Sequence, residues 1–158
     1  MVIDTLTIYA GEKELVMQVK DLMSSGVVSI TPEENASRAA RLLARHNIGA
    51  LPVCSTDGKI KGIITDRDIV LRCLAADSQP ESTQVREIMT KNVVTVSPED
   101  DLREASRLMA EKQIRRLPVA EDGHVVGMLS LGDLARTQQF DMEASKALSE
   151  ISSNIKKL

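Results

Sequence analysis

An internal repeat restricts the fold of this sequence more than any other feature. Residues 19–53 align without a gap on residues 85–119, and 14 of the 35 aligned positions are identical. The second copy then lacks one residue, and beyond that point the match continues. Residues 62–65 (Gly-Ile-Ile-Thr) correspond to residues 127–130 (Gly-Met-Leu-Ser). Chance does not produce such a match. The 158 residues therefore contain two tandem copies of a unit of about 60 residues.

The first half of each copy predicts a strand followed by a helix. The β-branched runs at residues 27–30 and 93–96 favour strands. Thr31 and Ser97 each stand before proline and glutamate, an order typical of a helix start. In the helix that follows, small and apolar side chains recur every three to four residues.

The second half of each copy predicts a hairpin and another helix. An Asp-Gly turn at residues 57–58, and again at 122–123, separates two apolar runs. The next helix is expected to start at Thr65 in one copy and at Ser130 in the other. The predicted order is β-α-β-β-α, twice. Because so small a unit buries little surface alone, the two units are expected to pack on each other.

Composition argues against a nucleic-acid partner. Tyr9 and Phe140 are the only aromatic residues, and the formal net charge is −3. Proteins that bind single strands commonly stack bases on aromatic rings, and binding to the DNA backbone needs a basic face. The sequence has no recognisable export signal and no apolar stretch of membrane-spanning length, so a cytoplasmic protein without a membrane partner is expected.

Few residues suggest catalysis. Cys54 and Cys73 form no C-x-x-C pair and are expected to be small buried hydrophobes, with a redox role as the alternative. His46 and His124 are expected at the surface. The sequence has no H-E-x-x-H motif, Walker loop or Cys/His cluster. Neither an enzyme nor a catalytic cofactor or bound metal is expected.

The order of elements, together with the repeated Leu-Pro-Val and Gly-h-h-Ser/Thr-x-x-Asp phrases (h is hydrophobic), resembles the cystathionine-β-synthase (CBS) domain. Two copies in tandem are similar to the arrangement called a Bateman module. The resemblance implies an α/β (α+β) fold in which domains at 16–78 and 79–138 pack about a pseudo-twofold axis and leave two clefts. Residues 1–15 would be an N-terminal extension, and residues 139–158 a C-terminal amphipathic helix.

The repeated phrase permits two roles. Thr65 with Asp68, and Ser130 with Asp133, fit a capping box, in which each side chain bonds the other residue's backbone N–H. In the second role the hydroxyl donates to a phosphate oxygen, and the carboxylate accepts from ribose hydroxyls. The two roles can coexist. Gly62 and Gly127, the first residues of the two phrases, fit places where a neighbouring group approaches the backbone closely.

The resemblance implies that each cleft takes its phrase from one domain and its adenine-binding wall from the other. The ligand would be AMP, ADP or ATP, with Mg²⁺ able to arrive on the phosphates. Cleft one would contain Ile63, Thr65, Arg67, Asp68, Arg86, Met89, Ile114, Arg115 and Arg116. Cleft two would contain Lys20, Met23, Ser25, Ile48, Gly49, Ala50, Met128, Ser130 and Asp133, and could share Arg115. The arginines predict that cleft one binds the more highly charged nucleotide, and cleft one is the expected site if only one is occupied.

The C-terminal tail predicts a narrow apolar seam. Ala144, Leu148, Ile151, Ile155 and Leu158 follow a four-three spacing. The seam could pack on its own module or on a second copy, and CBS modules often pair, so a homodimer is expected. Binding of a nucleotide would be signalled to a regulated protein that the sequence does not identify. The alternatives are a protein-interaction scaffold whose phrases only cap helices, a module for S-adenosylmethionine or another adenosyl ligand, and a thiol-based sensor or enzyme subunit.

Overall fold

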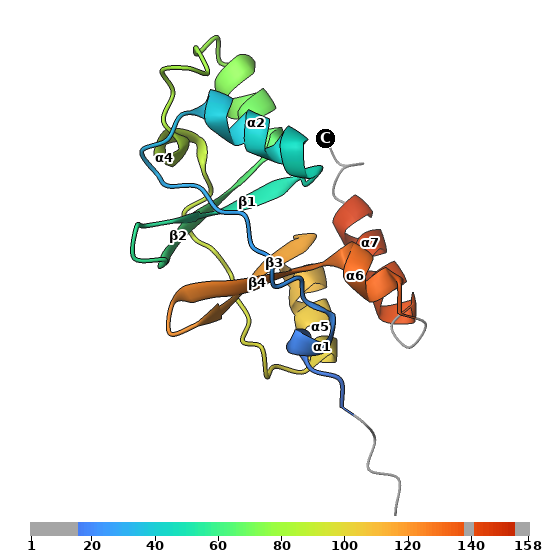
Figure 1. The fold of residues 1–158 in the computed structure, drawn as a ribbon. Coiled ribbons are helices and arrows are strands. Elements are labelled where there is room, and N and C mark those ends of the chain that lie inside the picture. Colours follow the sequence, from blue (N-terminus) through green and yellow to red (C-terminus); the bar gives the residue numbers. More distant parts are fainter. Residues whose placement is uncertain (1–15, 138–140, 154–158) are drawn as a thin grey trace, which may run out of the picture.

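The computed structural model describes residues 16–137 and 141–153. The predictions for residues 1–15, Ile155 and Leu158 lie outside these ranges. Two β-hairpins lie at the centre, with helices on their outer sides (Figure 1). This mixture of helices and strands confirms the predicted fold class. The first unit comprises α2 (Ala36–His46), β1 (Ala50–Cys54), β2 (Ile60–Thr65), α3 (Asp66–Asp68) and the π-helix η2 (Ile69–Leu74). The second comprises α5 (Leu102–Lys112), β3 (Arg116–Glu121), β4 (His124–Ser130), α6 (Leu131–Ala135) and α7 (Asp141–Ser153).

The hairpins form as predicted, each around its Asp-Gly turn. Strands β1 and β2 pair antiparallel, as do β3 and β4. Gly58 and Gly123 have φ of 86° and 79°, a left-handed conformation that glycine adopts without steric cost. The two hairpins also touch near their tips, where Ile60 N donates to Gly123 O over 3.0 Å.

Each hydrophobic core includes a short helix from the other repeat. Helix α1 (Val19–Leu22) places Val19 in the core of the second unit, and Val19 N donates to Asp100 O over 2.9 Å. Helix α4 (Val85–Ile88) places Val85 in the core of the first unit, and Val85 N donates to Glu34 O over 2.8 Å. Each repeat therefore packs its first short helix into the core of the other unit, and this exchange holds the two units together.

The predicted strands at 27–30 and 93–96 are wrong as regular strands. Only Ile30 and Val96 form bridges there, to Val53 and Val119, and both are parallel. The segment that ends at Ile30 begins at Ser24, which pairs with Met128 of the other hairpin. The chain between them crosses from one unit to the other, so it cannot run along a single strand.

The predicted helix starts at Thr31 and Ser97 are also wrong, whereas those at Thr65 and Ser130 are confirmed. Helix α2 has Asn35 as its N-cap, with the Arg38 amide donating to Asn35 Oδ1 over 2.8 Å, and α5 has Asp101 in that place. The Pro-Glu segment forms a turn instead. Its carbonyls accept bonds from α4, since Arg86 N donates to Pro32 O over 3.0 Å. If a helix started at Thr31, those carbonyls would instead accept bonds from N–H groups four residues later in the same helix.

The C-terminal helix packs on its own unit. Ala144, Ala147 and Ile151 of α7 are buried in the second core. Leu148, predicted for the same seam, is 46% exposed. In the first unit Cys54 and Cys73 are buried, as predicted. Among the described residues, no helix is long and apolar enough to cross a membrane.

Candidate functional site

Both repeated phrases form capping boxes. Thr65 N donates to Asp68 Oδ2 over 2.9 Å, and Asp68 N donates to Thr65 Oγ1 over 3.1 Å. In the second unit Ser130 N donates to Asp133 Oδ2 over 2.8 Å, and Asp133 N donates to Ser130 Oγ over 3.1 Å. The predicted capping role is therefore confirmed. It uses one oxygen of each carboxylate and leaves each hydroxyl proton available to a further acceptor.

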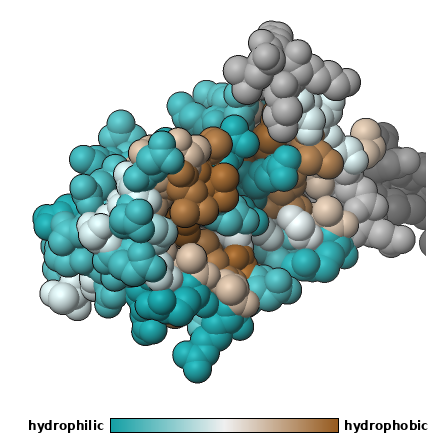
Figure 2. Space-filling model, turned by 90° about the horizontal axis from the view of Figure 1, so that it is seen from above, coloured by the Kyte–Doolittle hydropathy of each residue, from teal (hydrophilic) through white to brown (hydrophobic). Residues whose placement is uncertain are grey.

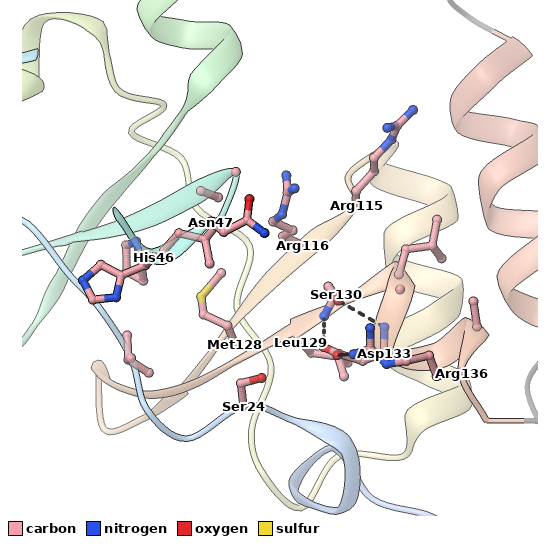
Figure 3. A pocket seen from close by; sticks show the side chains of 18 of the residues that line it. Ser24, His46, Asn47, Arg115, Arg116, Met128, Leu129, Ser130, Asp133 and Arg136 are labelled. Atoms are coloured by element: carbon pink, nitrogen blue, oxygen red, sulfur yellow. Dashed lines mark hydrogen bonds and ion pairs between the residues drawn. The ribbon is translucent and has the colours of Figure 1, made fainter. Parts of the chain in front are cut away.

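The second oxygen of each carboxylate faces an arginine on the same helical segment. Arg72 Nε lies 3.8 Å from Asp68 Oδ1, and Arg136 pairs with Asp133 Oδ1 (Figure 3). The carboxylate side chains are only 12% and 11% exposed. A ligand hydroxyl that bonds either Oδ1 must share it with the arginine or displace the arginine.

A cavity of about 1120 Å³ lies between the two units at cleft two. The first unit contributes Ile48, Gly49 and Ala50 to its wall, and the second contributes residues 128–133. Six residues predicted for cleft two thus line one space: Ile48, Gly49, Ala50, Met128, Ser130 and Asp133. Lys20, Met23 and Ser25 are not among the lining residues. The crossing segment contributes Ser24, Gly26, Val27 and Val28.

The Met23 side chain packs against Gly127 of β4 instead. A Cβ added at Gly127 would lie 2.7 Å from Met23 Sδ and 3.0 Å from Ser24 O. Gly62 has the same relation to Met89 and to the Thr90 carbonyl. The predicted close approach at both glycines is confirmed. The approaching group is the protein's own crossing segment.

Three arginines line the cavity: Arg115, Arg116 and Arg136. Figure 3 shows Arg115 and Arg116 above Ser130 and Asp133. The prediction assigned Arg115 and Arg116 to cleft one and allowed cleft two to share Arg115. The structure places both arginines on the wall of the cavity at cleft two. This placement corrects the expected concentration of positive charge in cleft one.

The sequence reasoning missed several lining residues. Arg136 stands three positions after Asp133, and this helical spacing could have identified it. His46, exposed as predicted, and Asn47 end α2 at the rim. From α7, Ala144, Ser145 and Leu148 complete the wall. No local signal indicates that α7 lies there.

The residues predicted for cleft one are not brought together in one space. Ile63 pairs with Thr90, and their backbones exchange bonds of 3.0 and 2.9 Å. Arg67 is exposed, and Arg86 bonds Gln84 beside its own helix. Ile114 packs against the second core. Two of the predicted residues, Asp68 and Met89, contact Arg72, whose Nε lies 3.8 Å from Asp68 Oδ1 and whose Nη1 donates to Met89 O over 3.3 Å.

Comparisons with known proteins agree with this architecture. The family model for the CBS domain matches residues 19–74 and 85–139. The CBS domain-containing protein YhcV of Bacillus subtilis is 42% identical over 134 residues, which cover 85% of this chain and 94% of that protein.

Two solved structures share the fold. The CBS domain pair of protein MJ0100, in complex with 5′-methylthioadenosine and S-adenosyl-L-methionine, is 32% identical with a TM-score of 0.71, over 77% of this chain and 94% of that one. Hypoxic Response Protein I, with two coordinated zinc ions, is 34% identical with a TM-score of 0.70, over 76% and 98%. Among the residues described here, no group of three or more His, Cys, Asp or Glu could hold a metal ion. The chain therefore belongs to the CBS domain family and carries two CBS domains in tandem.

Proposed function

We propose that this CBS domain pair is a non-catalytic regulatory module that binds a phosphorylated adenosine ligand, of the AMP, ADP or ATP class, in the cavity at cleft two. One observation carries the proposal. The cavity joins the Ser130–Asp133 phrase of one unit to Ile48, Gly49 and Ala50 of the other, with three arginines on its wall. CBS domain pairs are regulatory ligand-binding modules, and the family member MJ0100 is in complex with adenosyl compounds.

The polar groups of the cavity suit a ribose. Ser130 Oγ accepts a bond from Asp133 N, so its hydroxyl proton is free to donate to the ligand. Asp133 Oδ1 can accept from a ribose hydroxyl if Arg136 moves toward the phosphate. Ile48, which is 39% exposed, and Met128 offer apolar contact to a base. Adenine could therefore bind without an aromatic side chain.

The charges of the cavity favour phosphate. Guanidinium groups pair well with phosphate oxygens, and Arg115, Arg116 and Arg136 all face this space. The sulfonium of S-adenosylmethionine would meet three like charges there, which disfavours binding. The volume of about 1120 Å³ lies slightly above the range of roughly 300–1,000 Å³ that is common for ligand cavities, so a nucleotide fits without expansion of the site.

The position of α7 offers a route to a partner protein. Because Ala144, Ser145 and Leu148 line the cavity, a bound ligand would contact α7 directly and bias how this helix docks. A regulated protein could then sense the position of α7.

A second copy of the chain is a further proposed partner. From above, the surface shows hydrophobic areas framed by hydrophilic residues (Figure 2). On η2, Val70, Leu71 and Leu74 are each about half exposed. If two copies of the chain packed η2 against η2 about a twofold axis, the exposed apolar side chains of both copies would be covered.

Thermal denaturation with AMP, ADP, ATP and S-adenosylmethionine tests the proposal. A ligand that binds only the folded state raises the melting temperature, so the three nucleotides should raise it and S-adenosylmethionine should not. Stabilisation by S-adenosylmethionine alone would contradict the assignment of a phosphorylated ligand. No response to any of the four would favour an interaction scaffold.

A further inference from the structure

Arg72 bridges the two predicted walls of cleft one. Its Nη1 donates to Ile88 O over 3.0 Å and to Met89 O over 3.3 Å. Its Nε lies 3.8 Å from Asp68 Oδ1. One guanidinium thus connects the carboxylate of the Thr65–Asp68 phrase to the end of α4. Asp68 and Met89 are both residues predicted for cleft one.

Cleft two lacks this bridge. In the repeat, Thr137 occupies the position that corresponds to Arg72, and a threonine side chain is too short to make the same bridge. Arg136 pairs with Asp133 on its own helical turn and its side chain is 74% exposed. Among the described bonds, none joins Arg136 to Leu22 or Met23, the counterparts of Ile88 and Met89. Arg136 can therefore swing away without separating two parts of the protein.

We infer that Arg72 is the residue that closes cleft one, so that the chain binds a single nucleotide, at cleft two. This inference rests on the proposed function. The guanidinium pairs with the Asp68 carboxylate, which would otherwise accept from ribose, and it is itself anchored by two carbonyls at the end of α4. A ribose hydroxyl that bonds Asp68 Oδ1 would therefore have to compete with an arginine anchored by two further bonds. The duplicated phrase is therefore a ligand site in one copy and an internal crosslink in the other.

Calorimetric titration with AMP tests the inference by stoichiometry. The wild type is expected to bind one AMP per chain, and Arg72→Ala two. Arg72→Met keeps the aliphatic stem and removes the guanidinium, so it should also bind two even if Arg72→Ala folds poorly. Arg67→Ala removes an exposed arginine from the same phrase and should still bind one. The reciprocal variant Thr137→Arg should weaken AMP binding at cleft two.

Two outcomes would overturn the inference alone: two AMP molecules bound to the wild type, or one bound to both Arg72 variants. Absence of AMP binding to the wild type and to both Arg72 variants would instead reject the proposed function, and the inference with it. The two failures are therefore distinguishable in the same titration.

Discussion

The guanidinium of Arg116 lies against the α-carbon of Gly49, in the space that a side chain at position 49 would occupy. A Cβ built on Gly49 would overlap Arg116 Nη2 and lie 3.0 Å from Cζ. Both residues line the cavity, yet they come from different CBS domains. The missing side chain of Gly49 thus sets where a positive charge sits in the proposed site.

Gly49→Ala should therefore weaken nucleotide binding without unfolding the protein. The obstructed group is the end of a flexible side chain, so Arg116 can move aside at little cost in stability. Loss of one charge-assisted hydrogen bond costs about 1.5–3 kcal/mol, roughly a tenfold to hundredfold rise in Kd for AMP. Gly26→Ala is the matched control, because a Cβ at this other cavity glycine meets nothing within 4 Å. Equal Kd values for Gly49→Ala and the wild type would refute the role given to this contact.

Gly127→Ala should destabilise the fold itself. The added Cβ would lie 3.0 Å from the Ser24 carbonyl, which belongs to a backbone bridge and cannot rotate away. Overpacking of this kind typically costs about 1–3 kcal/mol. Chemical denaturation should show the loss, with Gly26→Ala again as control. Unchanged stability would mean that the crossing segment shifts freely.

Cys54 should react slowly with a thiol reagent such as iodoacetamide. Burial raises the pKa of the Cys54 thiol, so at pH 8 less of it is thiolate than in an unfolded chain. The buried Cys73 thiol lies 3.5 Å from Ser78 O and should also react slowly. Mass spectrometry should find both cysteines unmodified in the native protein and modified after denaturation. Rapid native modification would revive the thiol-sensor alternative.

Ser130→Ala and Thr65→Ala should have the same effect on stability and different effects on binding. Each removes an N-cap hydroxyl, which costs about 0.5–2 kcal/mol. Only Ser130 lines the described cavity, so only its variant should bind AMP more weakly. Thermal denaturation and calorimetry on the same samples separate the two effects.

Local patterns account for much of the fold. The Asp-Gly hairpins, the two capping boxes and the close approach at Gly62 and Gly127 all depend on residues near in sequence or on the repeat. The starts of α2 and α5 were not predictable in this way, because the Pro32 carbonyl before α2 accepts a bond from Arg86, far along the chain.

The candidate site shows the same limit. Ser130 and Asp133 follow from the phrase, but the placement of Arg116 beside Gly49 depends on how the two domains meet. The contribution of Leu148 to the cavity depends on where α7 docks. The spacing of apolar residues in the tail did not decide whether this helix packs on its own module or on a second copy.

Calorimetry on a matched pair of carboxylate variants tests the central claim most directly. Asp133→Asn and Asp68→Asn make the same change in the two capping boxes, one in the cavity at cleft two and one in cleft one. AMP binding should be lost or strongly weakened in Asp133→Asn and retained in Asp68→Asn. Equal losses in both variants, or loss only in Asp68→Asn, would contradict the claim that the nucleotide site is the cavity around Ser130 and Asp133.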